Sequence, residues 1–391
     1  MATLTTTTTT QQRQQSDTAR DVLIPMFSLT YLKKNITQDI APYVLRVTYT
    51  DNIKSESDTI EVELEDVDGK WENQWYPGKG DTVTLQMGYL GEKMLDCGTF
   101  SIDEIESRGP PSTVSIKGVA TSVNTALRTK SNRGFENTTL GAIASRIAKK
   151  HKLKLVGSIE PIKLDRVTQN NETDVAFLKR LGKEYGYAVK VTATQIVFSH
   201  LDTLRGLPSV MTLARTDIAS YSLRDTINQV YKSAKLKHQN ASDKKLVVYE
   251  ADGSVSQSTK TAKTAKTHAD TTSADTLKVN GRASNQDTAE RKATAALNSH
   301  NEYQEQGQIT VMGAVTLVAG NKVTLVGFGK FSGDWLLNAV RHTLTRSNGY
   351  VSEMEIVRGP LTKGTKTKKK TTLTVYHPDG TTSTTVKEKK K

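Results

Sequence analysis

The chain has 391 residues, of which 36% are hydrophobic, and it carries a formal net charge of +13. That length is too great for one ordinary domain, so we expect two or more domains and polar tails. The single cysteine, Cys97, excludes intramolecular disulfides and cysteine-rich metal sites. We find no export signal and no apolar stretch of about 20 residues, so we expect a soluble chain without stable membrane insertion.

The positive charge is concentrated in one segment. Residues 361–391 hold nine lysines against Asp379 and Glu388, which gives this segment +7 and leaves +6 for the rest of the chain. We interpret residues 361–391 as a solvated tail rich in Lys and Thr. No aromatic residues are interleaved with its lysines, so it predicts nonspecific attraction to DNA and no specific nucleic-acid partner.

The N-terminal part changes from a polar repeat to a pattern of strands. Residues 1–21 are rich in Thr and Gln and predict a disordered segment. Residues 22–120 alternate with a period of two between Gly, Pro, Asp and Asn turns, which predicts half-buried antiparallel strands in a barrel or a sandwich. We assign this segment as the first β-barrel. The apolar positions expected to share a face are Tyr43, Leu45, Val47 and Tyr49 in one strand, and Ile60, Val62 and Leu64 in the next.

Residues 121–205 show a helical period and predict an α/β module. Asn171 with Asp174 is the expected cap of the second helix, and Gly186 is its expected stop. The buried stripes are expected to be Leu140, Ile143, Ala144, Ile147 and Ala148 in the first helix, and Val175, Leu178, Leu181 and Tyr185 in the second.

Residues 241–304 are predicted to be an insertion that ends in a helix, because residues 250–283 are poor in apolar side chains and rich in Thr, Ala and Lys. Ser284 and Asp287 are its expected capping pair. Its narrow apolar stripe comprises Ala289, Ala293, Ala296 and Leu297. Strand patterns in residues 206–240 and 305–360 predict a second β-barrel.

Two stretches of strand about 240 positions apart resemble each other. GDTVTLQMG, from Gly80, resembles GNKVTLVGF, from Gly320, and GTFSI, from Gly98, resembles GDWLL, from Gly333. Each copy is followed by one more strand, STVSIKGV or GYVSEMEIV. Such features are common in hairpins, but their matching order favours an internal duplication.

We identify no catalytic, cofactor-binding or metal-binding constellation. The chain lacks the GxSxG, HExxH and GxxxxGK[ST] motifs. Its seven histidines are scattered without the spacing of metal ligands, and we expect His342 to be a hydrogen-bonded histidine of the core. The carboxylates between Glu56 and Glu72 alternate with apolar residues and indicate the solvent-exposed face of a strand.

Trp71, Trp75 and Tyr76 crowd large aromatic side chains beside a turn. Aromatic residues in such a place serve either as a plug of the core under a hairpin or as anchors of a protein interface, and the first role is the commoner. These three residues are therefore interface candidates with a structural alternative.

Three parts of the sequence resemble the phage late control protein D family, the baseplate hub of contractile tails. The first runs from PYVLRVTYTDN to STVSIKG, and the last is LVAGNKVTLVGFGKFSGDWLLNAVRHTLTRSNGYVSEMEIVRG. The middle part resembles the family motif Gln-x-x-Glu-Ser-Asp-x-x-Phe-Leu-x-Arg-Leu, with Thr173 in place of the Ser. The motif residues are Gln169, Glu172, Asp174, Phe177, Leu178, Arg180 and Leu181.

The resemblance implies a mainly β fold with α+β parts: two barrels like the tail-tube protein, an α/β middle module and connecting segments. The resemblance also implies that this fold is shared with the N-terminal half of valine-glycine repeat protein G of type VI secretion. It implies a non-enzymatic homotrimer in the baseplate of a virion or similar particle, assembled in the bacterial cytoplasm. The implied partners are the hexameric tail-tube protein, a separate spike protein and other baseplate proteins.

Residues 361–391 are the candidate contact with the spike, with Lys368, Lys369, Lys370 and Tyr376 as interface candidates. Two alternatives remain open. The first is a hub with cell-wall hydrolase activity, which would need a fused module with a paired acid and base. The second is a DNA-contacting tail protein, which would need strong binding that depends steeply on salt.

Overall fold

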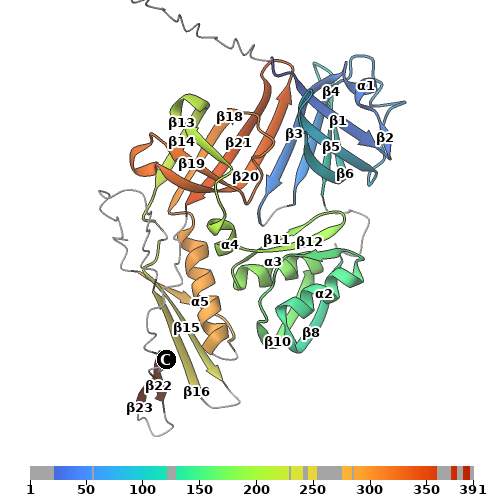
Figure 1. The fold of residues 1–391 in the computed structure, drawn as a ribbon. Coiled ribbons are helices and arrows are strands. Elements are labelled where there is room, and N and C mark those ends of the chain that lie inside the picture. Colours follow the sequence, from blue (N-terminus) through green and yellow to red (C-terminus); the bar gives the residue numbers. More distant parts are fainter. Residues whose placement is uncertain are drawn as a thin grey trace, which may run out of the picture.

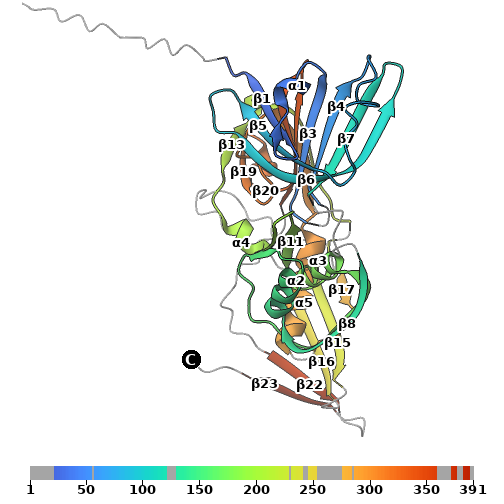
Figure 2. The same ribbon diagram turned by 90° about the vertical axis from the view of Figure 1, so that its right-hand side faces the viewer.

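The computed structural model describes most of the chain (Figure 1). The described residues are 22–54, 57–120, 129–228, 230–240, 245–252, 275–283, 286–358, 371–376 and 382–387. The expected disorder of residues 1–21, the cap residue Ser284, and Lys368, Lys369 and Lys370 lie outside them. Two barrels lie side by side at one end of the molecule, and the helical parts extend away from them (Figures 1 and 2).

The first barrel encloses a core of alternating apolar side chains, among them Ile60, Val62 and Leu64, as predicted. In β3 the pairing with β4 is irregular between Val44 and Arg46, so Val44 is buried where Leu45 was expected. The elements are β1 (Pro25–Tyr31), β2 (Lys34–Asn35), α1 (Thr37–Ile40), β3 (Val44–Asn52), β4 (Thr59–Glu65), β5 (Thr82–Tyr89), β6 (Leu95–Arg108) and β7 (Thr113–Val119).

The second barrel has its own core around the fully buried Trp335. Its strand β20 also pairs with β3, so one sheet of 13 strands runs through both barrels. Its elements are β13 (Met211–Ala214), η2 (Arg215–Asp217), β14 (Ile218–Asp225), β18 (Glu305–Met312), β19 (Lys322–Val326), η3 (Gly329–Phe331), β20 (Gly333–Thr345) and β21 (Gly349–Arg358).

The α/β module buries the two predicted helix stripes in one core, although Val175 is only partly buried. Thr173, whose side chain accepts a hydrogen bond from the amide of Ala176, caps α3 in place of Asn171, which belongs to β10. The helix stops before Gly186, at φ +78°, as predicted. The elements are β8 (Lys130–Thr139), α2 (Leu140–Lys150), β9 (Lys154–Val156), β10 (Lys163–Thr173), α3 (Asp174–Glu184), β11 (Tyr187–Val191), β12 (Gln195–His200) and α4 (Leu201–Gly206).

A further small unit differs from the expected polar insertion. Strand β15 (Ser233–Asn240), expected in the second barrel, pairs instead with β16 (Lys245–Asp252) and β17 (Thr276–Val279). Helix α5 (Gln286–Asn301) covers this sheet with the buried stripe Ala289, Ala293 and Leu297; Ala296 is only partly buried. The hairpin of β22 (Thr371–Tyr376) and β23 (Thr382–Lys387) lies beside β16 (Figure 1).

The sequence repeat corresponds to a structural repeat. Gly80 and Gly320 adopt φ of +88° and +93°, and Gly98 and Gly333 are also in the left-handed region. The amide of Gly80 donates to the carbonyl of Ile102 at 2.7 Å, and the amide of Gly320 donates to that of Leu337 at 2.9 Å.

The two copies also pair their strands in the same register. Val83 lies opposite Phe100 in the first barrel, and Val323 lies opposite Trp335 in the second. The pairing then shifts after Ile102 in β6 and after Leu337 in β20. Strands β3, β4, β7, β6 and β5 therefore correspond to β14, β18, β21, β20 and β19. This correspondence supports the predicted duplication, and the mainly β fold with α/β parts is confirmed.

Candidate protein interfaces

The three aromatic interface candidates lie in the loop between β4 and β5. Trp71 is 5% exposed and belongs to the core, whereas Trp75 and Tyr76 are 40% and 52% exposed. Trp71 and Trp75 pack edge to face, with ring centroids 5.2 Å apart, and Tyr43 packs against both. Trp71 is therefore a plug of the core, whereas Trp75 and Tyr76 are exposed and stay candidates for an interface.

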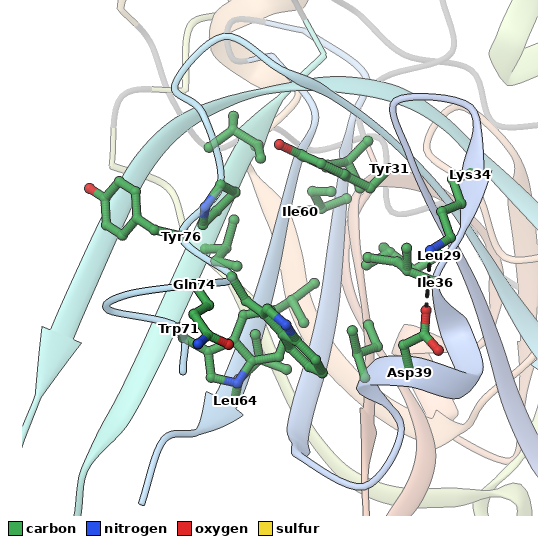
Figure 3. A pocket seen from close by; sticks show the side chains of 18 residues that line it. Leu29, Tyr31, Lys34, Ile36, Asp39, Ile60, Leu64, Trp71, Gln74 and Tyr76 are labelled. Carbon is green, nitrogen blue, oxygen red and sulfur yellow. Dashed lines mark ion pairs between the residues drawn. The ribbon is translucent and has the colours of Figure 1, made fainter. Parts of the chain in front are cut away.

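These residues line an open pocket of about 410 Å³ at the end of the first barrel (Figure 3). Its wall is largely apolar, and Lys34 and Asp39 form an ion pair at 3.9 Å within its lining. Such a hollow with exposed aromatic residues suits an apolar side chain or loop of a partner protein. The other apolar and aromatic residues that line it include Leu29, Tyr31, Ile36, Ile60, Val62, Leu64 and Ile116.

The same loop is held at its other end by Asp81. One carboxylate oxygen of Asp81 accepts hydrogen bonds from the Tyr31 hydroxyl and from the amide of Gly78, the latter at 3.1 Å. Partial burial, together with this hydrogen bond, raises the pKa of Tyr31, so its hydroxyl stays protonated and able to donate. These bonds fix the β1 wall of the pocket relative to the loop.

His342 in β20 is fully buried, as predicted. Its Nε2 lies 2.8 Å from the carbonyl of Leu317, which can only accept, so this nitrogen carries the proton. Its Nδ1 then accepts from the hydroxyls of Tyr350 and Ser352, at 2.8 and 3.0 Å. Burial lowers the pKa of His342 and keeps the ring neutral. Its role is structural.

The family motif also has a structural role in the α/β module. Asp174 is fully buried and binds Lys150 at 2.9 Å, His151 at 2.7 Å and Gln169 at 2.9 Å, as well as Arg133. Burial alone would raise its pKa, but these hydrogen bonds and the charge of Arg133 lower it to about 2. The carboxylate is therefore ionised and holds α3 against α2 and β8.

A second buried ion cluster joins this module to the barrels. Lys190 in β11 binds Asp51 in β3 and Asp58, the latter at 2.8 Å. The second oxygen of Asp51 accepts from the amide of Ala319 in the second barrel at 2.8 Å. Burial is the main cause that raises the pKa of Asp58, while Lys190 opposes the rise. Three parts of the molecule meet at this cluster.

Of the remaining candidates, Tyr376 ends β22, where its backbone lies opposite Thr382. Within the described ranges, no group of three or more His, Cys, Asp or Glu side chains is placed to hold a metal ion. Nor is any helix in the described part of the chain long and apolar enough to cross a membrane. Sequence reasoning missed the β1 residues of the pocket, because nothing local to β1 indicates that it pairs with β5.

The chain is similar to hub proteins of known phages. It is 34% identical over 201 residues to the probable baseplate hub protein of Escherichia phage 186, covering 50% of this chain and 51% of that protein. It is 31% identical over 182 residues to the probable baseplate hub protein of Escherichia phage P2, covering 46% of each. The chain thus spans about half the length of these curated relatives.

Two solved structures share the fold. A 43 kDa tail protein of prophage MuSo2 from Shewanella oneidensis superposes with a TM-score of 0.63 at 14% identity, covering 85% of this chain and 98% of that one. A tail protein from Neisseria meningitidis MC58 gives a TM-score of 0.61 at 13% identity, covering 85% and 96%. Residues 121–348, more than half of the chain, match the family of phage tail baseplate hub (GPD) proteins. The chain therefore belongs to the phage tail baseplate hub family.

Proposed function

We propose that this chain is the structural hub of a contractile phage tail or a related injection machine. Three copies would form a ring that joins the hexameric tail tube at one end to a central spike at the other. The observation that carries this proposal is the repeat of five strands, in the same order and register, within one chain. Three chains with two such units present six similar units, which fits both a six-fold and a three-fold partner.

The faces of the shared sheet support an arrangement of this kind. Side chains of one face form the two barrel cores, whereas the other face carries ion pairs such as Arg46–Glu63 at 3.0 Å and Lys117–Glu104 at 3.2 Å. A polar face on a continuous sheet suits the wall of a water-filled channel. In our proposal this face lines the lumen of the ring.

We also propose that the function involves no bond chemistry. Four of the five buried carboxylates in the described part of the chain, those of Asp51, Asp58, Asp174 and Glu302, are engaged by lysine or arginine side chains within the fold. The fifth, Asp66, accepts a hydrogen bond from the amide of Trp71 at 3.1 Å. The open pocket of the first barrel is lined mainly by apolar residues. These features support a role in holding parts together. Trp75 and Tyr76 are the proposed anchors for a neighbouring protein of the baseplate.

The proposal is tested by measuring the mass of the purified chain in solution, alone and with the tube and spike proteins of its own particle. We expect a mass of three chains, and a three-fold ring between tube and spike in a map of the intact baseplate. A chain that stays monomeric with both partners would refute the proposal. Clearing of peptidoglycan in a zymogram would favour the hydrolase alternative, and a steeply salt-dependent DNA affinity lost on deletion of residues 361–391 would favour the DNA alternative.

A further inference from the structure

Eight neighbouring strands of the large sheet are two copies of one four-stranded unit. The order is β14, β18, β21 and β20, followed by β3, β4, β7 and β6. The last strand of the first set pairs with the first strand of the second set, antiparallel, over Ala339–Thr345 and Arg46–Asn52. We call this junction the seam. It is a contact between two copies of the same unit, within one chain.

The seam has a counterpart at each end of the run. Strand β14 corresponds to β3, and its outer edge has no partner strand in the described part of the chain. Strand β6 corresponds to β20. Its residues 104–108 pair with β7 on one side, and no described strand pairs with them on the other, since β5 pairs only as far as Ser101. One chain thus carries two open strand edges: β14, which is equivalent to β3, and the end of β6, which is equivalent to the part of β20 that pairs with β3.

Exposure of equivalent residues agrees with two uncovered edges. Val47 of β3 is fully buried at the seam, whereas its counterpart in β14, Tyr221, is 46% exposed. Ser222 and Arg224 of β14, and Arg108 of β6, are also exposed. Open edges leave backbone donors and acceptors available to another strand, and natural proteins rarely leave long ones uncovered in their working state.

We propose that β14 of one chain pairs antiparallel with residues 104–108 of β6 in a second copy, in the register of the seam. This inference rests on the trimer proposed above and names its interface. At the seam, Arg341 lies opposite Thr50 and His342 lies opposite Tyr49. Transferred by the repeat, the register sets Glu106 opposite Arg224 and Ser107 opposite Leu223. Each chain has one edge of each kind, so the contact is head-to-tail, and in the trimer proposed above three such contacts would close the ring.

The side chains at the transferred positions are complementary. Glu106 and Arg224 occupy positions equivalent to Arg341 and Thr50, on the polar face of the sheet, so the pair would join opposite charges directly across the strands. Within its own chain Glu106 already accepts hydrogen bonds from Arg108, at 2.9 and 2.7 Å. Lys117 also lies 3.8 Å from this carboxylate, so Arg224 of the second copy would add a third cation to it. Such a pair favours the proposed register over registers in which the two strands are shifted relative to each other.

Disulfide trapping tests the register directly. Cys97, the natural cysteine, is first replaced in the full-length chain by Cys97→Ala. Glu106→Cys with Arg224→Cys should then form bonds between chains and give a covalent trimer on a non-reducing gel. Thr50→Cys with Arg341→Cys is the matched positive control, because these residues are opposite each other within one chain and should give a cross-linked monomer. Glu106→Cys with Ser220→Cys is out of register by four residues, about 13 Å, and should not cross-link.

A charge exchange provides a test that needs no thiol. Glu106→Arg alone and Arg224→Glu alone should each raise the dissociation constant of the trimer about tenfold or more, and the double exchange should recover most of the loss. Glu355→Arg makes the same change on the polar face of an inner strand and should leave the dissociation constant within about threefold of that of the unaltered chain.

The outcomes separate this inference from the proposed function. Two results for a chain that is a trimer by mass would overturn the proposed pairing and leave the hub proposal intact. The first is no cross-link between positions 106 and 224 while the positive control does cross-link. The second is no recovery of the dissociation constant in the double exchange. A chain that is monomeric alone and with tube and spike overturns both. A covalent trimer in the predicted register together with recovery by the double exchange supports the inference.

Discussion

His342 of the second barrel stacks on Tyr49 of the first, with ring centroids 6.0 Å apart and ring planes 13° apart. The two residues are directly opposite in β20 and β3. The same imidazole is hydrogen-bonded to Leu317, Tyr350 and Ser352. The seam between the barrels is therefore held by aromatic contact and by a buried polar network as well as by strand pairing.

Replacement of this histidine should destabilise the protein in a pH-dependent way. His342→Leu leaves two hydroxyls and a carbonyl without their partner and should lower the free energy of unfolding by about 3 kcal/mol at pH 8. Because burial lowers the pKa of His342 below its unfolded value of 6.5, the unfolded chain binds more protons and the natural protein loses stability as pH falls below about 6.5.

The difference between the two proteins should therefore shrink between pH 8 and pH 5, as followed by urea unfolding. His300→Gln, at an exposed position of α5, is the control and should show a difference that is small at both values. A difference for His342→Leu that grows on acidification would contradict the assigned neutral ring.

Local patterns predicted much of this fold. Alternation in β4 and the helical stripes of α2 and α3 depend on residues near each other in the chain, and they were placed correctly. The errors depend on distant partners. Val44 is buried in place of Leu45 because the pairing of β3 with β4 is irregular. Strand β15 lies outside the second barrel because it pairs with β16 and β17. No single segment encodes such pairings.

The candidate site was predicted in part. The sequence indicates an aromatic cluster at Trp71, Trp75 and Tyr76, but exposed and buried aromatic residues look alike before β1 and α1 are placed around them. The equivalence of the open edges of β14 and β6 to the two strands of the seam follows from the register of the repeat. Gly80 and Gly320 indicate in the sequence how the two copies align, but only the strand pairings define the register.

The aromatic loop predicts a separation of stability from binding. Trp71→Ala removes a core side chain and should lower the free energy of unfolding by about 3–4 kcal/mol. Tyr76→Ala removes an exposed one and should cost less than about 1 kcal/mol, yet it should weaken association with a baseplate partner. Chemical denaturation and co-purification with the assembled baseplate measure the two effects. A Tyr76→Ala chain that is unfolded, or that assembles as well as the unaltered chain, would count against this assignment.

The Asp174 cluster predicts a loss of stability in acid. Its pKa of about 2 in the folded chain lies below the unfolded value of about 3.9, so its contribution is present above pH 4 and is lost as pH falls toward 2. Asp174→Asn should lower the free energy of unfolding by about 2–3 kcal/mol at pH 7 and should flatten this acid dependence. Asp165→Asn, at an exposed position of β10, is the matched control. Equal unfolding curves for the two variants at pH 7 would disprove the role of the cluster.

Lys190 predicts the opposite dependence on pH. Lys190→Met leaves Asp51 and Asp58 facing each other without a cation and should lower the free energy of unfolding by about 3–5 kcal/mol at pH 8. Without the lysine the pKa of Asp58, already raised by burial, rises further, and the folded variant binds more protons than its unfolded chain. Part of the lost stability should therefore return as pH falls from 8 to 5.

Denaturant titration at both pH values measures this recovery, with Lys183→Met on the exposed face of α3 as a control that removes the same charge. The control should stay within about 0.5 kcal/mol of the natural protein. A Lys190→Met chain that is as stable as the natural protein at pH 8, or that weakens further at pH 5, would show that this ion cluster does not hold the α/β module against the barrels. Recovery at low pH would show that the cost of the variant lies in the two uncompensated carboxylates.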